Sequence, residues 1–202
     1  MDLIVTIVRH GNTFDAGQHA RRIGARTDLP LVASGFDQAD ALGGKFAEQG
    51  LTFDRALAAP LRRTRSTIDR ILARQSQAPV VESVDWLTEI DHGPDEGQID
   101  SRVVARIGHD ALAAWDGDAR APDGWIVDAD RRIQGWRGLW KTDRGRVLIV
   151  TSNGAARFAL LSDEGLRSQA SGLPSLKLRT GAYGSIVRAQ GELRLLTWDQ
   201  RP

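Results

Sequence analysis

The sequence predicts a single α/β domain, in which a mainly parallel sheet is covered by helices on both faces to give three layers. Two β-branched apolar runs, 3–8 and 146–151, each end abruptly in polar residues and glycine, as buried parallel strands do. Between these runs, helical periodicity alternates with short strand-like stretches. The 202 residues suffice for one hydrophobic core and contain no linker-like segment, so we expect residues 1–202 to form one domain.

In the first half of the chain, each periodic segment is separated from the next by turn residues. Ser34 is placed to cap a helix that Gly50 would close. The expected elements are a strand over 3–8, a short helix over 12–20, a helix over 34–48, a strand over 55–58, a helix over 64–74 and a strand over 80–84.

In the second half, Trp136 and Trp140 are spaced to share one face of a helix. The segment 98–143 is expected to build a cap over a pocket. The expected elements are a helix over 99–115, a loop over 116–124, a helix over 128–142, a strand over 146–151, a helix over 154–161 and a closing hairpin of 185–188 and 193–197 around Gly191.

Composition excludes several classes of function. The net charge of +1 argues against a large nucleic-acid footprint, and no apolar run approaches the roughly 20 residues of a membrane span. The first residues lack the basic region of a signal peptide, and the absence of cysteine excludes disulfides and thiolate metal sites. We therefore expect a cytoplasmic protein without nucleic-acid or membrane partners. No spacing typical of metal ligands or of a Walker loop is present, so no cofactor and no metal are expected.

Four segments place polar residues at or near predicted strand ends. They are 9–11, 59–64, 87–93 and 151–154. A parallel sheet collects such ends in one crevice, where helix N-termini also favour anions. An imidazole, guanidinium groups, a carboxyl and free backbone N–H groups together predict a site for phosphoryl transfer. The glycine that follows His10 would let a phosphate approach the backbone.

These segments resemble the histidine phosphatase (phosphoglycerate mutase-like) superfamily. The Arg-His-Gly-x-Thr motif of that family, which ends its first strand, is matched by Arg9 to Thr13. The order and spacing of further segments also agree. They are 28–31, 35–39, 60–67, 87–93 and 96–97.

The resemblance implies that His10 is the nucleophile, which attacks phosphorus and forms a phosphohistidine. Arg9 and Arg63 would hold the equatorial phosphoryl oxygens. Arg62 and Arg65 are close neighbours of Arg63 in the sequence, so the choice among these three arginines stays open.

The resemblance assigns the acid to Glu89, which would protonate the leaving alcohol and then activate water. A negatively charged substrate nearby would favour the protonated carboxyl that the first step requires. Asn12 or Thr13 would add hydrogen bonds to the phosphoryl group.

The fourth segment departs from the family pattern, which has a second histidine in a Ser-His-Gly-Gly-x-x-Arg sequence. Counting back from Arg157 places Ser152 at the histidine position, whereas counting from Gly154 places Asn153 there; the arginine spacing favours Ser152. Either side chain can donate a hydrogen bond to a phosphoryl oxygen, but neither can carry an imidazolium charge. Loss of one such donor typically costs about 100- to 1000-fold in rate.

The other histidines have simpler interpretations. His92 follows Glu89 closely and would compensate for the missing histidine if it reached the pocket, but we favour a role in loop packing. His19 and His109 are expected to be solvated.

The sequence therefore predicts a metal-independent phosphomonoester hydrolase that acts on a small-molecule phosphate ester through His10. The alternative, supported by the missing histidine, is a phospho-ligand binding protein with impaired turnover. A phosphoglycerate mutase-type phosphotransferase is the less favoured third possibility, because the chain has little room for the insertions of such mutases.

Overall fold

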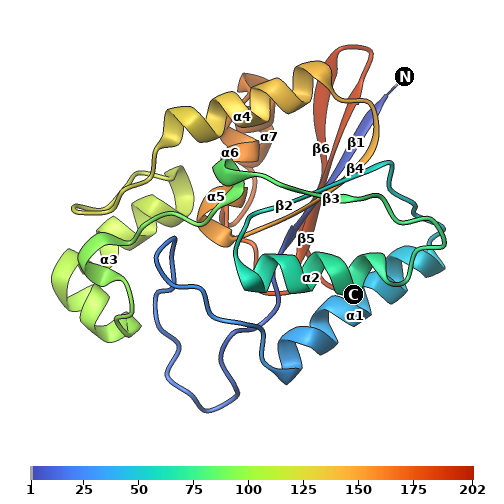
Figure 1. Cartoon of the computed structure of the whole chain (residues 1–202). Helices are drawn as coiled ribbons and strands as arrows, with labels where there is room; N and C mark the ends of the chain where they lie inside the picture. The colour runs from blue at the N-terminus through green and yellow to red at the C-terminus, as the bar shows by residue number, and fades with distance from the viewer. Residues whose placement is uncertain (1) are drawn as a thin grey trace.

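The first strand of the chain lies in the middle of the sheet. In the computed structural model, which describes residues 2–202, β1 pairs in parallel with β4 on one side and antiparallel with β5 on the other (Figure 1). The strand order is β3-β2-β4-β1-β5-β6, and the first four are mutually parallel. The strands are β1 (Leu3–Arg9), β2 (Arg55–Ala58), β3 (Val81–Ser83), β4 (Gly145–Thr151), β5 (Tyr183–Ala189) and β6 (Glu192–Gln200). The predicted mainly parallel sheet with a closing hairpin is confirmed.

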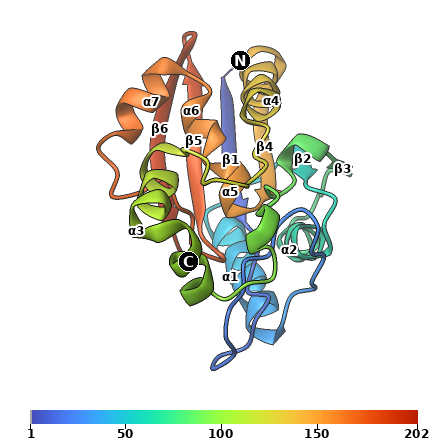
Figure 2. The same cartoon turned by 90° about the vertical axis from the view of Figure 1, so that its left-hand side faces the viewer.

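Helices cover both faces of this sheet, which confirms the three layers. Side chains of β1 alternate between the two: Leu3, Val5 and Ile7 enter one core cluster, and Val8 enters the other. The face toward Val8 is covered by α1 (Ala33–Glu48) and α2 (Arg62–Leu72). The opposite face is covered by α4 (Ala129–Thr142), α5 (Asn153–Ala156), α6 (Phe158–Leu161) and α7 (Glu164–Ala170) (Figure 2).

Two expectations at the start of the chain are wrong. Residues 12–20 form no helix, because the backbone N–H of Asn12 donates to Gln38 Oε1 at 2.9 Å and its carbonyl accepts from Val32 N at 3.1 Å. These bonds tie the segment to the beginning of α1. Ser34 does not cap that helix, since its hydroxyl accepts from Asn12 Nδ2 at 3.2 Å and Val32 occupies the cap position.

Two further differences concern the chain after β4. The expected helix over 154–161 is interrupted at Arg157, which separates α5 from α6. The sequence also gave no indication of α7, a seven-residue helix capped by Asp163, whose Oδ1 accepts from Leu166 N at 3.0 Å. A helix of only seven residues that contains Gly165 has too few apolar repeats to be recognised from the sequence.

The expected cap over 98–143 divides into two parts. The helix α3 (Asp100–Asp118) extends into the expected loop and bends at Gly108, and Figure 1 places it at the end of the sheet where β1 terminates. By contrast, α4 packs on the sheet, with Trp136 and Trp140 stacked at 5.3 Å in the core. Only the first part of the segment is therefore near the carboxyl ends of the strands. Two short 3-10 turns, η1 (Asp85–Leu87) and η2 (Gly93–Asp95), precede it.

The loop after β1 crosses α1 at very short range. A Cβ on Gly11 would collide with the carbonyl oxygen of Gly35, and a Cβ on Gly35 would collide with that of Asn12. The sequence suggested that Gly11 serves the approach of a phosphate. Its missing side chain instead admits the backbone of α1, which fixes the position of His10 beside that helix.

We expect Gly35→Ala to destabilise the fold by about 1–3 kcal/mol, because an added methyl group must push two backbone segments apart. Gly44→Ala is a matched control on the same helix, since a Cβ there meets nothing within 4 Å. That control should leave the fold unchanged or stabilise it by up to about 1 kcal/mol. Urea unfolding of both variants measures the difference. Equal midpoints would show that the Gly11–Gly35 contact is not tight.

Candidate active site

Three parallel strands bring the predicted site residues to one edge of the sheet. His10 N donates to Thr151 O at 3.1 Å and Ala59 N donates to Val150 O at 3.2 Å, so the ends of β1, β2 and β4 are adjacent. A cavity of about 750 Å³ opens at this edge. Its wall includes Arg9, His10, Asn12, Thr13, Glu89 and Asn153. This is the crevice in which open α/β sheets bind their ligands.

The imidazole of His10 is buried and held in one orientation. Its Nδ1 lies 2.8 Å from the carbonyl oxygen of Gly11, and its Nε2 lies 3.2 Å from Nε of Arg63. A carbonyl oxygen only accepts and a guanidinium only donates, so Nδ1 holds the proton and Nε2 presents its lone pair. Nε2 is therefore the nitrogen available for nucleophilic attack.

The surroundings of His10 also keep its ring neutral. Burial, followed by the positive charges of Arg63 and Arg9, lowers the pKa of His10 well below its ordinary value of 6.5, and the bond to Gly11 acts in the opposite direction. Both cationic neighbours disfavour a third positive charge. At neutral pH the lone pair on Nε2 is therefore retained.

Among the three candidate arginines of α2, the structure brings Arg63 to His10. Arg63 is fully buried, whereas Arg62 and Arg65 are exposed. Its Nη1 donates to Thr27 O at 2.6 Å and its Nη2 donates to Gly24 O at 3.2 Å. Two carbonyls of one loop thus fix the guanidinium that contacts the imidazole.

Arg63 contacts His10 without lining the cavity, whereas Arg9 supplies a cation to the cavity wall itself. Nη1 of Arg9 donates to Leu178 O at 2.7 Å, while its Nε is buried and has no hydrogen-bond partner among residues 2–202. A buried N–H without a partner costs free energy. An anion in the cavity would supply the missing acceptor.

Glu89 lines the same cavity as Arg9 and His10. It is 6% exposed, its Oε1 accepts from Ile90 N at 2.9 Å, and its Oε2 accepts from Gly154 N at 3.1 Å. A Cβ on Gly154 would collide with the carboxylate, so glycine is required at that position. The carboxyl is held rigidly next to the cavity.

Asn12 and Thr13 line the cavity near its mouth. The amide of Asn12 is already engaged within the protein, because Oδ1 accepts from Thr180 Oγ1 at 2.5 Å and Nδ2 donates to Ser34 Oγ at 3.2 Å. Of these two residues, Thr13 has the side chain that is freer to bind a ligand.

The two candidates for the histidine position differ in their placement. Ser152 is fully buried, its hydroxyl has no hydrogen-bond partner within the described chain, and it is not part of the cavity wall. Asn153 lines the cavity, but its Oδ1 accepts from Leu178 N at 2.9 Å. The serine side chain at the end of β4 therefore contributes nothing to the cavity wall.

His92 lies in the cavity wall, although we expected it to pack a loop. His92 lines the cavity and also packs within its loop. The residue is 6% exposed, and its ring meets that of Trp125 edge-on with 4.6 Å between ring centroids. Its Nδ1 lies 3.5 Å from Glu96 Oε2. His19 and His109 are exposed, as expected.

The sequence did not indicate that a buried arginine holds the backbone just before Glu89. Arg132, on α4, donates to the carbonyls of Val127, Trp86 and Thr88, the residue before Glu89. Nothing in the sequence distinguishes it, because only three of the 27 basic residues are lysines and arginine occurs throughout the chain.

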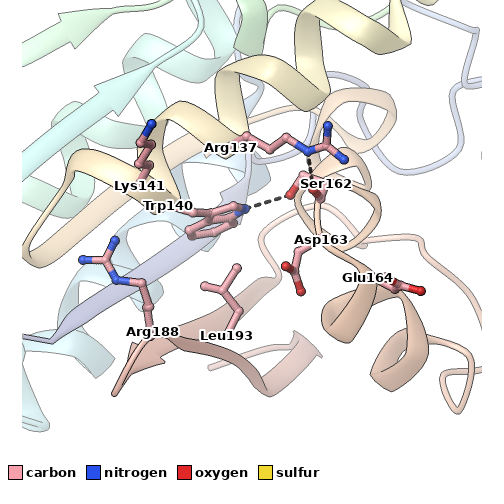
Figure 3. A pocket seen from close by; sticks show the side chains of 9 residues that line it. Arg137, Trp140, Lys141, Ser162, Asp163, Glu164, Arg188 and Leu193 are labelled. Carbon is pink, nitrogen blue, oxygen red and sulfur yellow. Dashed lines mark hydrogen bonds between the residues drawn. The ribbon is translucent and has the colours of Figure 1, made fainter.

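A second hollow, of about 530 Å³, lies between α4, the link from α6 to α7, and the β5–β6 hairpin (Figure 3). Arg137 and Trp140 both donate to Ser162 there, at 2.8 and 2.7 Å, which joins α4 to the α6–α7 link. No histidine lines this hollow within the described residues, so it does not resemble the cavity at His10.

The fold and site define an α/β protein whose cavity is lined by a neutral histidine and by Arg9, with the fully buried Arg63 in contact with that histidine. The chain belongs to the histidine phosphatase superfamily (branch 1), whose family model matches residues 5–201. The resemblance inferred from the motifs is thereby confirmed.

Two relatives in sequence are phosphoglycerate mutases. The chain is 28% identical over 112 residues to a 2,3-bisphosphoglycerate-dependent phosphoglycerate mutase of Bacteroides fragilis, which is 55% of this chain and 44% of the mutase. It is 26% identical over 129 residues to the mutase of the same description from Borreliella burgdorferi, covering 63% and 51%. The chain thus spans about half the length of these relatives.

Solved structures with the same fold match over nearly the whole chain. One titled mycobacterial hydrolase 1 has a TM-score of 0.79 at 21% identity and covers 100% of both chains. A mycobacterial glucosyl-3-phosphoglycerate phosphatase has a TM-score of 0.77 at 20% identity, covering 98% of this chain and 99% of its own. A putative alpha-ribazole-5'-P phosphatase from Escherichia coli has a TM-score of 0.72 at 22% identity, covering 98% and 97%.

Residues 2–202 contain neither a membrane-spanning helix nor a cluster of metal ligands. No helix in that range has the length and apolarity needed to cross a membrane. Over the same range, no group of three or more histidines, aspartates or glutamates is arranged to hold a metal ion.

We expect Arg63→Met to raise the pKa of His10 toward 6.5, because the neighbouring positive charge that disfavours the imidazolium is removed. An NMR titration of the His10 ring measures this change. In the wild type the ring should stay neutral well below pH 6.5. Arg65→Met, an exposed neighbour on the same helix, should leave the titration unchanged. A wild-type pKa close to 6.5 would contradict the burial and charge argument.

Proposed function

We propose that this protein is a phosphomonoester hydrolase that works through a phosphohistidine on His10. The observation that supports it is the state of that ring: Nδ1–H is fixed by Gly11 O, and Nε2 is unprotonated beside Arg63. A buried imidazole that is neutral and oriented, with two guanidiniums beside it, fits attack on a dianionic phosphoryl group.

In the first step, Nε2 of His10 forms a bond to phosphorus as the bond from phosphorus to the alcohol oxygen breaks. The N–H of Arg63 leaves Nε2 and donates to a phosphoryl oxygen instead. The lone pair of Nε2 is then free to bond to phosphorus. Arg9 Nε, which lacks an acceptor among the described residues, donates to another. Glu89, protonated in the substrate complex, passes its proton to the leaving alcohol.

In the second step, water attacks phosphorus and the bond to Nε2 breaks. Glu89, now a carboxylate, takes a proton from that water, and inorganic phosphate leaves. The phosphorylated ring carries positive charge, which the hydrogen bond from Nδ1–H to Gly11 O stabilises. In this proposal Arg9 and Arg63 supply the positive charge at the phosphoryl group, so no metal ion is required.

The rival proposal is a phospho-ligand binding protein that keeps the cavity but has impaired turnover. The buried position of Ser152 favours it, because the arginine spacing assigns that residue to the family's second histidine and it contributes nothing to the cavity wall. A mutase-type phosphotransferase would share the first step and differ in passing the phosphoryl group to a second substrate.

We expect His10→Ala to reduce phosphate release from a generic aryl phosphate by at least about 1000-fold, since the nucleophile is removed. Wild-type protein mixed with the same ester should yield an acid-labile phosphoprotein that the variant lacks. His109→Ala, an exposed histidine away from the cavity, is the control and should retain full activity.

The outcomes of that experiment separate the three candidates. Absence of both His10-dependent release and phosphoprotein would remove the hydrolase and leave the binding protein, which should still bind inorganic phosphate. A mutase would instead depend on a bisphosphate primer and release little free phosphate.

Restoring a histidine in the fourth segment should raise the rate. We expect Ser152→His to increase turnover by up to about 100- to 1000-fold, the range typically lost with one transition-state donor. Asn153→His is the matched comparison, because its position already lines the cavity. An increase only in Asn153→His would show that the alignment through Gly154 is the right one. No increase in either variant, with both folded by circular dichroism, would contradict this account of the segment.

A further inference from the structure

We propose that Glu96 is a positioning residue for this reaction, which fixes the loop over residues 24–27 that holds Arg63 against His10. The inference rests on the proposed function, and Glu96 itself is not part of the cavity wall. Its action on the site would pass through two sets of hydrogen bonds.

The first set joins Glu96 to the loop. Oε1 accepts from the backbone N–H of Gly24 at 2.8 Å and from the hydroxyl of Thr27 at 2.6 Å. One carboxylate oxygen thus holds both ends of the 24–27 loop. The Glu96 side chain is only 9% exposed, so water competes little for these bonds.

The second set joins the same two loop residues to Arg63. The carbonyl of Thr27 accepts from Nη1 at 2.6 Å, and the carbonyl of Gly24 accepts from Nη2 at 3.2 Å. Glu96 and Arg63 therefore bind different atoms of the same two residues, Gly24 and Thr27. If the loop shifts, the acceptors that set the direction of the guanidinium shift with it.

Close packing leaves the loop little freedom as long as Glu96 is in place. A Cβ on Gly24 would collide with Glu96 Oε2 and with the carbonyl of Ile90, so no other residue fits at that position. Oε2 also accepts from His92 N at 3.3 Å. The same carboxylate thus connects the loop behind Arg63 with His92 in the cavity wall.

The ionised state of Glu96 agrees with this role. Burial alone would raise its pKa, but hydrogen bonds from His92, Thr27 and Gly24 prevail and lower the pKa of Glu96 to about 2. The carboxylate is therefore charged, and a strong acceptor, at any pH at which the protein would be assayed.

The loop has a second connection to the same segment, which provides a control. Arg26 donates to Asp91 Oδ1 at 3.0 Å and to Gly93 O at 2.6 Å, but its side chain is 56% exposed and contacts no atom that holds Arg63. An exposed pair of this kind contributes little to a structure. Arg26→Gln should therefore leave the active site unchanged.

The test compares Glu96→Gln and Thr27→Val with Arg26→Gln. Glu96→Gln leaves one oxygen and places an NH₂ donor against other donors, whereas Thr27→Val removes a single hydrogen bond and keeps the shape of the side chain. We expect kcat for an aryl phosphate to fall roughly 10- to 100-fold in Glu96→Gln and by less in Thr27→Val, with KM changed less than kcat. The NMR titration of His10 should move toward 6.5 in the same order, since Arg63 is displaced.

The NMR titration of His10 separates this inference from the proposed function, because the titration can be measured in a protein that has no enzymatic activity. If wild-type protein releases no phosphate, the proposed function fails, while a shifted His10 titration in Glu96→Gln and Thr27→Val would still support the positioning role. If Glu96→Gln does not fold, Thr27→Val alone decides. Unchanged kcat and unchanged titration in folded variants would overturn the inference, as would an Arg26→Gln titration shifted as far as that of Thr27→Val.

Discussion

The site depends on one buried guanidinium that must find all of its acceptors inside the protein. Arg63 is fully buried, and a buried cation without partners would cost several kcal/mol. Its acceptors are two carbonyls of a loop and the Nε2 atom of His10, which belong to separate parts of the chain. The requirement to satisfy this one group therefore locks the end of β1, the start of α2 and the 24–27 loop into a single arrangement. That arrangement also helps to orient the imidazole, and burial together with the charges of Arg63 and Arg9 keeps the pKa of His10 low.

Patterns within a few residues were sufficient to predict most of the fold. The strands β1 and β4 are central and buried, so their β-branched runs are unambiguous, and α1, α2 and α4 show a clear apolar face. The expectations that were wrong depend on distant residues. The helix over 12–20 is absent because Asn12 bonds to Gln38 and Val32, and such long-range competition cannot be read from a local pattern.

Site residues that belong to a sequence motif could be predicted, whereas residues that the fold alone brings to the site could not. His10 and Glu89 come from motifs, and the structure places both on one cavity wall. Arg63 is distinguished from Arg62 and Arg65 by its burial, which cannot be read from the sequence. Arg132 binds backbone carbonyls far away in the sequence, and no residue type or spacing marks it. Glu96 lies in a segment that resembles the family, but that resemblance does not indicate its bonds to Gly24 and Thr27. The fourth segment shows the converse: the motif narrowed the histidine position to Ser152 or Asn153, but only the structure shows that Asn153 lines the cavity and Ser152 does not.

The place of β1 between β4 and β5 has a consequence for how the protein reaches its native state. Residues 3–9 are paired on both sides by segments about 140 to 180 positions later, so the centre of the sheet closes the longest loops in the chain. Contacts of such sequence separation form slowly. During synthesis, His10 is made well before β4 and β5, so its surroundings exist only after those two strands have emerged. The proposed activity would therefore return after denaturation only when the slowest pairing is complete, and a truncated or misfolded chain would lack it even with its helices formed.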